Sequence, residues 1–229
     1  VSSTVTSSSA TGNVTGFRYV GGLVGYSVGT VSESYATGSV RGTRVDFSDV
    51  GGLVGYNAGT VTDSSATGSV DGSGDVGGLV GWNDVGGTAT KSYATGSVNG
   101  NNQNVGGLVG YSVGTVSESY ATGSVTGNSD VGGLVGENNG GTVDNSYWDV
   151  GTSTQNSAIG ADSGTASGLT GFGSVGDATP APEMVSINAT VRMTALDFST
   201  AWRPGDSDDA YPDLAWNSSF AGNADAFDA

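Results

Sequence analysis

Short runs of small, apolar and hydroxyl-bearing residues, separated by glycines, recur along most of the chain. In the run Tyr35–Val40, apolar or small residues alternate with Thr37 and Ser39. A period of two is typical of a β-strand, and it places Val40 on a buried face and the two hydroxyls on the opposite face. The repeats show no helical periodicity. The pattern therefore predicts an all-β protein.

Two sequence blocks return at intervals of about 26 to 30 residues. One is Val-Gly-Gly-Leu-Val-Gly, and the other is Ser-(Tyr/Ser)-Ala-Thr-Gly-Ser-Val, which first appears in full at Ser34. A single unit of this size cannot bury its own apolar side, whereas stacked units can. We therefore predict a three-sided parallel β-solenoid of about five to six turns with a C-terminal capping module. The first block begins at Val20, Val50, Val76, Val105 and Val131.

Stacking places equivalent residues of successive turns in columns, about 4.8 Å apart. Two columns of apolar residues are predicted to form the core: Leu23, Leu53, Leu79, Leu108 and Leu134, and Val40, Val70, Val98 and Val125. The predicted outward hydroxyl columns are Thr37, Thr67, Thr95 and Thr122, with Ser39, Ser69, Ser97 and Ser124. These hydroxyls are a candidate binding surface for a glycan or a partner protein. Simple solvation explains them as well, and an ice-binding face is a minor alternative.

Aromatic residues form two further columns, one of Tyr26, Tyr56, Trp82 and Tyr111 and one of Tyr35, Tyr93, Tyr120 and Tyr147. Stacked aromatic rings either cover a corner of the solenoid or, where they are exposed, stack on sugar rings. The sequence leaves both interpretations open.

Composition changes after the repeats. We assign the solenoid to residues 1–150, a Gly/Ser/Thr-rich connecting segment to 151–176, and an acidic cap and tail to 177–229. The alternation from Val185 to Ala195 favours a strand, with a short helix as the alternative. Bulky residues of this last part are expected to plug the final turn: Trp202, Tyr211, Leu214 and Trp216. The first turn has no matching cap, so we expect another repeat, domain or subunit to cover it.

The charge balance excludes several classes of function. The chain has 22 acidic and six basic residues, a net charge of −16, and neither histidine nor cysteine. This composition excludes His/Cys metal sites, histidine-dependent catalytic triads and disulfides. The negative charge argues against nucleic acid as a partner, and no apolar run is long enough to span a membrane. An acidic surface is compatible with a halophilic source, because salt screens the repulsion between its charges.

The acidic residues recur as features of the repeat and form no unique catalytic constellation. We therefore expect no enzymatic activity and no cofactor, with a polysaccharide-active enzyme as a minor alternative. Asp206, Asp208 and Asp209 are candidate calcium ligands. Their spacing does not fit an EF-hand loop, so a solvated acidic turn is the other interpretation of these residues. The acids near the corners are Glu33, Asp63, Glu118 and Asp144, and Asp49, Asp75 and Asp130. Three asparagines match the N-glycosylation triplet: Asn13, Asn188 and Asn217.

The repeats resemble the GLUG family, named for a Gly-Leu-hydrophobic-Gly motif that appears here as Gly22-Leu23-Val24-Gly25 and in four later copies. Asn145–Asp149 and Tyr211–Trp216 are similar to the closing module of that family. The resemblance implies a β-solenoid in a secreted or cell-surface, often adhesin-like, protein of bacteria or archaea. Some members accompany metallopeptidases, a role that cannot transfer to a chain without histidine.

These observations predict a non-enzymatic extracellular module, either an adhesin or a rigid surface spacer. Its hydroxyl columns would bind glycans or other surface proteins weakly at each site and multivalently overall. The alternative is a subunit of an extracellular filament or appendage, in which copies of the chain stack end to end.

Overall fold

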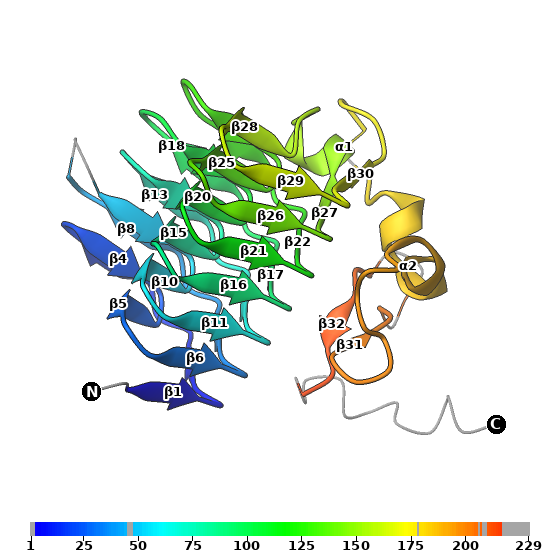
Figure 1. Cartoon of the computed structure of the whole chain (residues 1–229), viewed down its shortest axis with the longest axis horizontal. Coiled ribbons are helices and arrows are strands. Elements are labelled where there is room, and N and C mark those ends of the chain that lie inside the picture. The colour runs from blue at the N-terminus through cyan, green and yellow to red at the C-terminus, as the bar shows by residue number, and fades with distance from the viewer. Residues whose placement is uncertain (1–2, 45–47, 178, 206, 208–209, 217–229) are drawn as a thin grey trace.

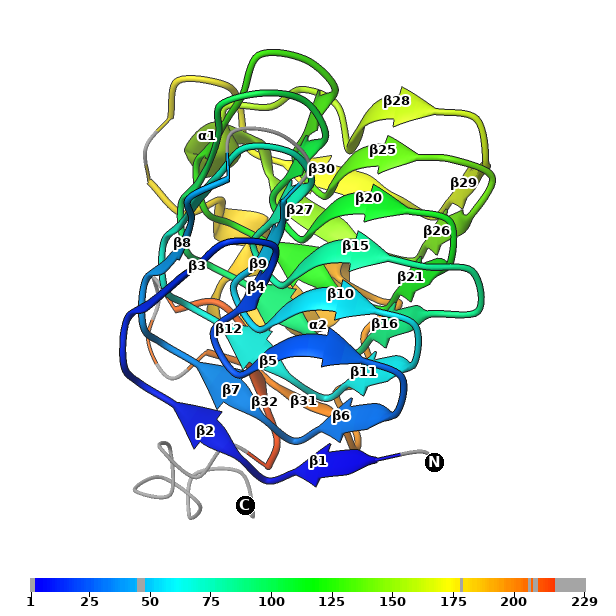
Figure 2. The ribbon, with the colours of Figure 1, turned by 90° about the vertical axis from the view of Figure 1, so that its left-hand side faces the viewer.

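A computed structural model describes residues 3–44, 48–177, 179–205, 207 and 210–216 of the chain. Its main body is a parallel β-solenoid of about six turns, in which each strand pairs with the equivalent strand of the turns before and after it (Figure 1). A complete turn contributes five short strands, and these line up in five parallel sheets (Figure 2). The predicted parallel β-solenoid is confirmed.

The strands are two to four residues long because glycines and bends interrupt the chain at every corner. The first sheet contains β1 (Thr4–Thr6), β6 (Thr30–Ser32), β11 (Thr60–Thr62), β16 (Thr88–Thr90), β21 (Thr115–Ser117), β26 (Thr142–Asp144) and β29 (Thr165–Ser167). The second contains β2 (Ser9–Ala10), β7 (Tyr35–Ala36), β12 (Ser65–Ala66), β17 (Tyr93–Ala94), β22 (Tyr120–Ala121), β27 (Tyr147–Asp149) and β30 (Thr170–Phe172).

The other three sheets follow in chain order around the turn. The third contains β3 (Val14–Gly16), β8 (Val40–Gly42), β13 (Val70–Gly72), β18 (Val98–Gly100) and β23 (Val125–Thr126). The fourth contains β4 (Tyr19–Gly21), β9 (Asp49–Gly51), β14 (Val76–Gly77), β19 (Val105–Gly106) and β24 (Val131–Gly132). The fifth contains β5 (Val24–Ser27), β10 (Val54–Asn57), β15 (Val80–Asn83), β20 (Val109–Ser112), β25 (Val135–Asn138) and β28 (Ile159–Asp162).

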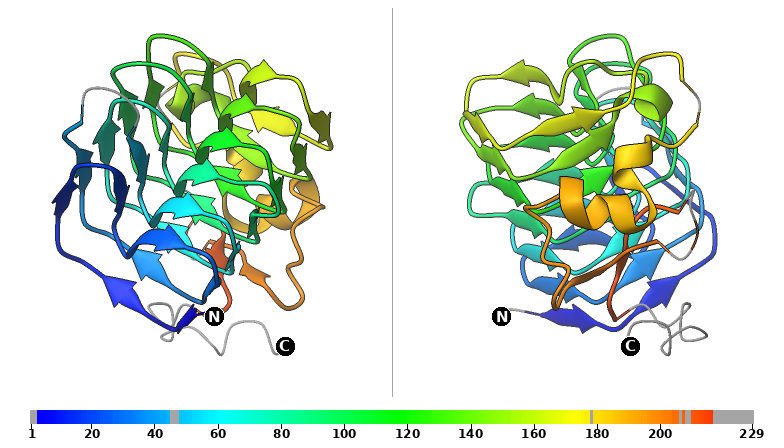
Figure 3. Two further views of the ribbon diagram at one scale, coloured as in Figure 1. Left: turned by 60° about the vertical axis from the view of Figure 1, so that its left-hand side comes forward. Right: turned by 90° about the vertical axis from the view of Figure 1, so that its right-hand side faces the viewer.

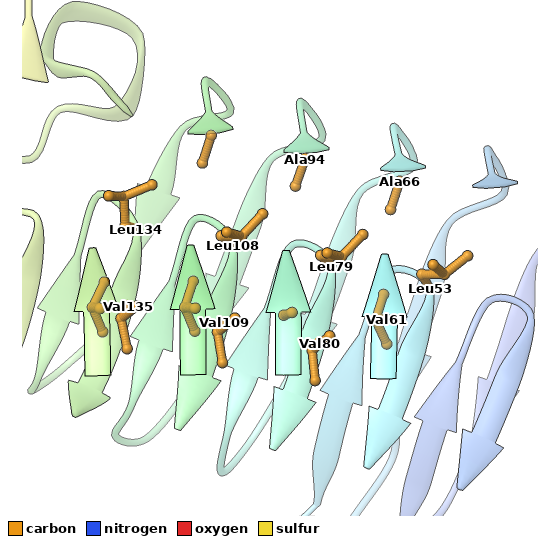
Figure 4. Close-up of a cluster of buried hydrophobic side chains, with 14 of the residues drawn as sticks. Leu53, Val61, Ala66, Leu79, Val80, Ala94, Leu108, Val109, Leu134 and Val135 are labelled. Atoms are coloured by element: carbon orange, nitrogen blue, oxygen red, sulfur yellow. The ribbon is translucent and has the colours of Figure 1, made fainter. Parts of the chain in front are cut away.

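The interior of the solenoid is filled by columns of like residues. Four of the five column leucines have no exposed surface, and they pack beside alanine and valine columns (Figure 4). Leu23, on the first turn, is half-buried. The valine column packs in a second cluster with the valines of the strands in the fourth sheet. Its members Val40, Val70, Val98 and Val125 are at most 1% exposed.

Buried hydroxyls satisfy the backbone at one corner. The backbone N–H of Ser34 donates to the Oγ of Ser64 on the next turn at 3.2 Å, and that of Ser64 donates to the Oγ of Ser92 at 3.1 Å. The Ser34 hydroxyl in turn donates to the carbonyl of Ser32 at 2.7 Å. Buried polar groups need such partners, so the serine column lets the chain turn without leaving unpaired donors.

We expected a connecting segment at residues 151–176, and the structure instead continues the solenoid there. A single helical turn, α1 (Val150–Ser153), is followed by β28, β29 and β30, which join three of the sheets. The sequence hid this turn because neither repeated block recurs there, and Ile159 takes the place of Val135 of the turn before. The C-terminal part of the chain follows this last turn.

The C-terminal residues fold back along the side of the solenoid, and the predicted plug of the last turn is wrong. The elements η1 (Pro182–Met184), α2 (Ser186–Arg192), β31 (Trp202–Arg203) and β32 (Asp213–Leu214) lie against the second sheet (Figures 1 and 3). Trp202 and Leu214, each 1% exposed, pack on the tyrosine column. The stacked rings of Tyr93 and Tyr120, with centroids 5.1 Å apart, provide a continuous apolar surface for this packing.

The strand expected from Val185 to Ala195 is also wrong, since α2 occupies most of it. Ala189 and Met193, four residues apart, are both fully buried, whereas Val191 is 68% exposed. This is the spacing of one helix face, and tertiary packing selected it over the alternation seen in the sequence. Among the residues that the structure describes, no helix is long and apolar enough to cross a membrane.

Candidate functional site

The predicted hydroxyl columns lie at the corner between the second and third sheets, which we call the hydroxyl corner. Thr37, Ser39, Thr67 and Ser69 are exposed, and the Ser69 hydroxyl donates to the Ser39 Oγ at 3.0 Å. On the next two turns, Ser97 and Ser124 are exposed, Thr95 is half-buried and Thr122 is only 5% exposed. The outward hydroxyls therefore run without interruption over the first three of these turns.

The Thr-Gly-Ser segments bend between two sheets. The glycine of each bend is required by close approach of the turns. A Cβ on Gly68 would lie 2.0 Å from the carbonyl oxygen of Gly38.

A shallow cavity of about 480 Å³ lies at the end of the hydroxyl corner where Thr122 is covered. The Thr152 hydroxyl of α1 donates to the Thr122 carbonyl at 2.5 Å, and the Gln155 amide donates to the Val125 carbonyl at 2.9 Å. These contacts hold the α1 segment over the corner. The cavity lining contains hydroxyls and glycines: Thr95, Ser97, Thr122, Gly123, Ser124, Gly151, Thr152, Thr154 and Gly176.

The second aromatic column, Tyr35, Tyr93, Tyr120 and Tyr147, is used inside the protein. The Tyr93 hydroxyl donates to Asp213 at 2.8 Å, the Tyr120 hydroxyl donates to the Pro212 carbonyl, and the Tyr147 hydroxyl accepts from the Ala195 N–H at 2.8 Å. Burial raises the pKa of Tyr120 well above its ordinary value. The C-terminal segment covers these rings, so they are not free to stack on a sugar.

The other aromatic column, Tyr26, Tyr56, Trp82 and Tyr111, faces solvent in part. Successive ring centroids are 4.9, 5.9 and 4.5 Å apart. The Tyr26–Tyr56 and Tyr56–Trp82 pairs are stacked, whereas the Trp82 and Tyr111 rings are tilted by 44°. Tyr56 therefore has a neighbouring ring on both sides, and stacking on a sugar requires an open face. Tyr26 is 52% exposed and stands at the end of the stack.

A column of buried polar side chains runs beside these rings. Asp49 is 6% exposed and Asp75 is 8% exposed. Burial, reinforced by the Asp75 carboxylate, raises the pKa of Asp49 to about 7, although Arg18 and Arg44 oppose the shift. Burial also raises the pKa of Asp75 to about 6, against the hydrogen bond that it accepts from Asn104 at 2.7 Å.

The remaining acids lie apart from one another. Glu33, Asp63 and Glu118 occupy the same left-handed corner position, with φ angles of 48°, 47° and 48°. Among the described residues, no three His, Cys, Asp or Glu side chains form a group that could hold a metal ion. The predicted calcium ligands Asp206, Asp208 and Asp209 lie outside the described residues.

Two of the three candidate glycosylation sites are at the surface. Asn13 is exposed, and its Oδ1 accepts a hydrogen bond from the Ser39 N–H at 2.9 Å. Asn188 is exposed on α2, and its Nδ2 donates to the Pro182 carbonyl at 3.1 Å. Asn217 lies outside the described residues.

Sequence reasoning missed the structural role of Asp149. Its carboxylate is fully buried and accepts from the Thr152 N–H at 3.0 Å, the Ala181 N–H at 2.7 Å and the Tyr211 hydroxyl at 2.7 Å. One side chain thus caps α1 and holds the C-terminal segment. The signal in the sequence is small: an acid at the end of a strand whose counterparts carry threonine.

Comparison with known proteins shows which sequence motif these repeats match. The GLUG motif matches residues 18–41, 48–71 and 101–126. Over 57 residues, or 25% of its length, the chain is 53% identical to halomucin from Haloquadratum walsbyi, and this stretch is 1% of halomucin. The chain thus spans a very small part of that relative. No solved structure matches the chain.

Proposed function

Because the chain is a GLUG-repeat protein with a continuous solenoid core, we propose that it is a rigid, non-enzymatic module of an extracellular surface protein. The GLUG repeats and the similarity to halomucin point to an extracellular surface repeat protein. The module would hold its outward residues at a constant spacing and contact glycans or other surface proteins through them.

The core supports a rigid module. Four leucines of successive turns lie fully buried in one column, and each strand of the central turns pairs on both edges. Bending such a solenoid would separate the turns on one side and expose apolar surface, at a cost of about 25 cal/mol for each Å². The fold therefore suits a spacer that keeps its length.

The observation that carries the binding role is the exposure of the same hydroxyl pair on successive turns. Thr37 and Ser39 on one turn are matched by Thr67 and Ser69 on the next. Identical weak sites at a fixed spacing gain overall affinity when a repetitive ligand contacts several of them together. A polymer with many hydroxyls, such as a glycan chain, has the complementary hydrogen-bonding groups.

The test is binding of immobilised neutral glycans by the single chain and by a tandem of two chains. We expect the tandem to bind at least tenfold more tightly, and T37V/S39A/T67V/S69A to remove most of that gain. A matched control is T30V/T60V, which removes hydroxyls from half-buried positions of the first sheet. Equal binding by the corner variant and the control would contradict the role of the hydroxyl corner.

The absence of enzymatic activity is part of this proposal. Incubation of the protein with a panel of polysaccharides should release no reducing ends above the rate of the buffer. Turnover that survives purification and is lost in D49N/D75N would overturn it.

Assembly by end stacking is a second candidate function. Leu23 and Val24 on the first turn are half-buried, whereas Leu53 and Val54 on the next turn are fully buried. Within the described residues, β5 is an edge strand of its sheet. Another GLUG turn laid on this edge would bury both side chains. Sedimentation at high protein concentration tests this role: growing particles that L23E abolishes support it, and strict monomers contradict it.

A further inference from the structure

The positive charge of this acidic protein is concentrated near one end of the solenoid. Arg18, Arg41 and Arg44 are three of the six basic residues in the chain. They lie on two corners that are adjacent in space, since the Thr43 N–H donates to the Gly16 carbonyl at 2.8 Å. Half of the basic residues of a chain with a net charge of −16 therefore lie at these two corners.

Aromatic rings accompany two of these arginines. The guanidinium carbon of Arg18 lies 4.6 Å from the centroid of the Tyr19 ring, and that of Arg44 lies 5.6 Å from the centroid of the Phe17 ring. The Tyr19 ring is in turn 5.5 Å from that of Tyr26. We call these five residues, Phe17, Arg18, Tyr19, Tyr26 and Arg44, the arginine–aromatic patch.

Three members of the patch are open to solvent, and the other two, Tyr19 and Arg44, are half-buried. Phe17 is 66% exposed, Tyr26 is 52% exposed, and Arg18 is exposed. Large apolar side chains with this exposure forgo the free energy of burial. Two exposed rings, Phe17 and Tyr26, beside two guanidinium groups are therefore unusual on a monomer surface. Within the described residues, Arg18 and Arg44 each lie over an aromatic ring.

The acid beneath the patch does not neutralise it. Asp49 is close enough to both Arg18 and Arg44 for each to lower its pKa, yet burial holds that pKa at about 7. A carboxyl with this pKa is largely protonated at mildly acidic pH and carries only part of a charge at neutral pH. The two guanidinium groups keep most of their charge for a ligand.

The repeat itself does not require the patch. The same corner carries Asp71, Gly72 and Ser73 on the third turn, and Asn99, Gly100 and Asn101 on the fourth. Those turns have the same strands and the same valine column without an arginine or an aromatic residue at the corner. The substitutions on the first two turns are therefore an addition to the fold.

We propose that the arginine–aromatic patch binds an acidic polysaccharide, a polymer whose sugars carry carboxylate or sulfate groups. A guanidinium group forms paired hydrogen bonds with either anion. The exposed rings of Phe17 and Tyr26 offer apolar surface to the C–H face of a sugar ring. The patch is separate from the hydroxyl corner and binds a different class of glycan, so it goes beyond the function proposed above.

High salt favours short-range contacts of this kind over long-range repulsion between charges. The acids elsewhere on the chain repel an anionic polymer over a Debye length, which is about 30 Å at 0.01 M salt and 3 Å at 1 M. Salt therefore removes the repulsion by distant acids as well as part of the attraction at the patch. The contribution of the rings is retained, so binding should weaken less with salt than a purely ionic contact would.

The test measures binding of four probes by the whole chain: dextran sulfate, polygalacturonate, neutral dextran and single-stranded DNA. We expect the two acidic polysaccharides to bind at least tenfold more tightly than neutral dextran, which contacts the hydroxyl corner only. The variant R18Q/R44Q should weaken both by at least tenfold, and F17A by about threefold to tenfold with the charge unchanged. The matched control R192Q/R203Q removes two exposed arginines from the C-terminal segment and should change binding by less than twofold.

Three results would overturn the proposal. One is binding of neither acidic polysaccharide by the intact chain, and another is an equal loss in the control and the patch variant. The third is DNA binding as tight as polysaccharide binding, because it would show a general affinity for polyanions. The variant T37V/S39A/T67V/S69A should bind the acidic polymers as the parent chain does, so failure at the patch and failure at the hydroxyl corner are distinguishable.

Discussion

Asn104 donates a side-chain hydrogen bond of 2.7 Å to the carboxylate of Asp75, which occupies the same position one turn earlier. Asp49 occupies that position on the turn before, so two carboxyls and an amide form one buried column. The amide shows what this column accommodates best, since Asn can donate to its neighbour without carrying a charge. Two predictions about pH follow from this arrangement.

Stability should fall as pH rises from about 4 to about 7. The folded-state pKa values, about 7 for Asp49 and about 6 for Asp75, lie above the ordinary value of 3.8. Between these values the native state holds protons that the unfolded chain has released, so the stability from these two groups is fully present below pH 4. It is lost by up to about 1.4 kcal/mol per pH unit for each group as pH rises through the folded pKa. Urea unfolding at pH 4.5, 6 and 8 measures this.

Asp49→Asn should flatten that dependence and stabilise the protein at pH 8, because it places a neutral amide where Asn104 shows that one fits. Asp71→Asn is the control, since Asp71 lies on a more exposed part of the same corner. A parent chain and a D49N variant with the same pH slope would show that Asp49 is ionised in the folded state.

Leu79→Ala should destabilise the solenoid by about 2–5 kcal/mol, because it leaves a cavity in a fully packed column. Leu23→Ala is the matched substitution at the half-buried position of the first turn and should cost distinctly less. Chemical unfolding followed by circular dichroism compares the two. Equal losses would contradict the difference in burial.

Gly68→Ala should lower the melting temperature by several degrees or prevent folding, because the added Cβ would lie 2.0 Å from the Gly38 carbonyl oxygen. Gly12→Ala makes the same chemical change at the equivalent corner of the first turn, where no atom lies within 4 Å of the added Cβ. A melting temperature for G12A within about two degrees of the parent, beside a large loss for G68A, would confirm that contact between turns requires the glycine.

Asp149→Ala should release the C-terminal segment while the solenoid stays folded. The substitution leaves the Ala181 N–H and the Tyr211 hydroxyl without their acceptor, at a cost of about 1–3 kcal/mol for each buried group. Tyr211→Phe removes one of these bonds and should have a smaller effect. Limited proteolysis near Trp202 with unchanged β-sheet circular dichroism would show the release; simultaneous loss of both signals would contradict it.

Salt should raise the melting temperature. The net charge of −16 makes the folded chain repel itself, and 1 M salt shortens the Debye length to about 3 Å. The variant E33Q/E118Q removes two acids from one corner column and should show a smaller rise. A melting temperature that stays constant from 0.05 to 1 M salt would contradict this prediction.

The sequence alone predicted the solenoid because its signal is repeated. A single Val-Gly-Gly-Leu-Val-Gly block is ambiguous, since Leu23 and Val24 would point in opposite directions in a regular strand. Five copies at intervals of 26 to 30 residues remove the ambiguity, because only stacking brings five like leucines into contact. The exposure of Thr37 and the burial of Val40 follow from the alternation between them. The GLUG assignment rests on the same repetition.

Tertiary structure decided everything that departs from the repeat. The last turn lacks both repeated blocks, so the sequence concealed it. The helix α2 formed where the sequence alternates, because packing against the tyrosine column decided which side chains of that segment are buried. The two aromatic columns have similar sequences, yet the C-terminal segment covers Tyr120 and leaves Tyr26 exposed. Local patterns determine which residues can form a column. Which columns remain open to a ligand depends on contacts between residues about 90 or more positions apart, such as Tyr120 with Pro212, and no local pattern contains them.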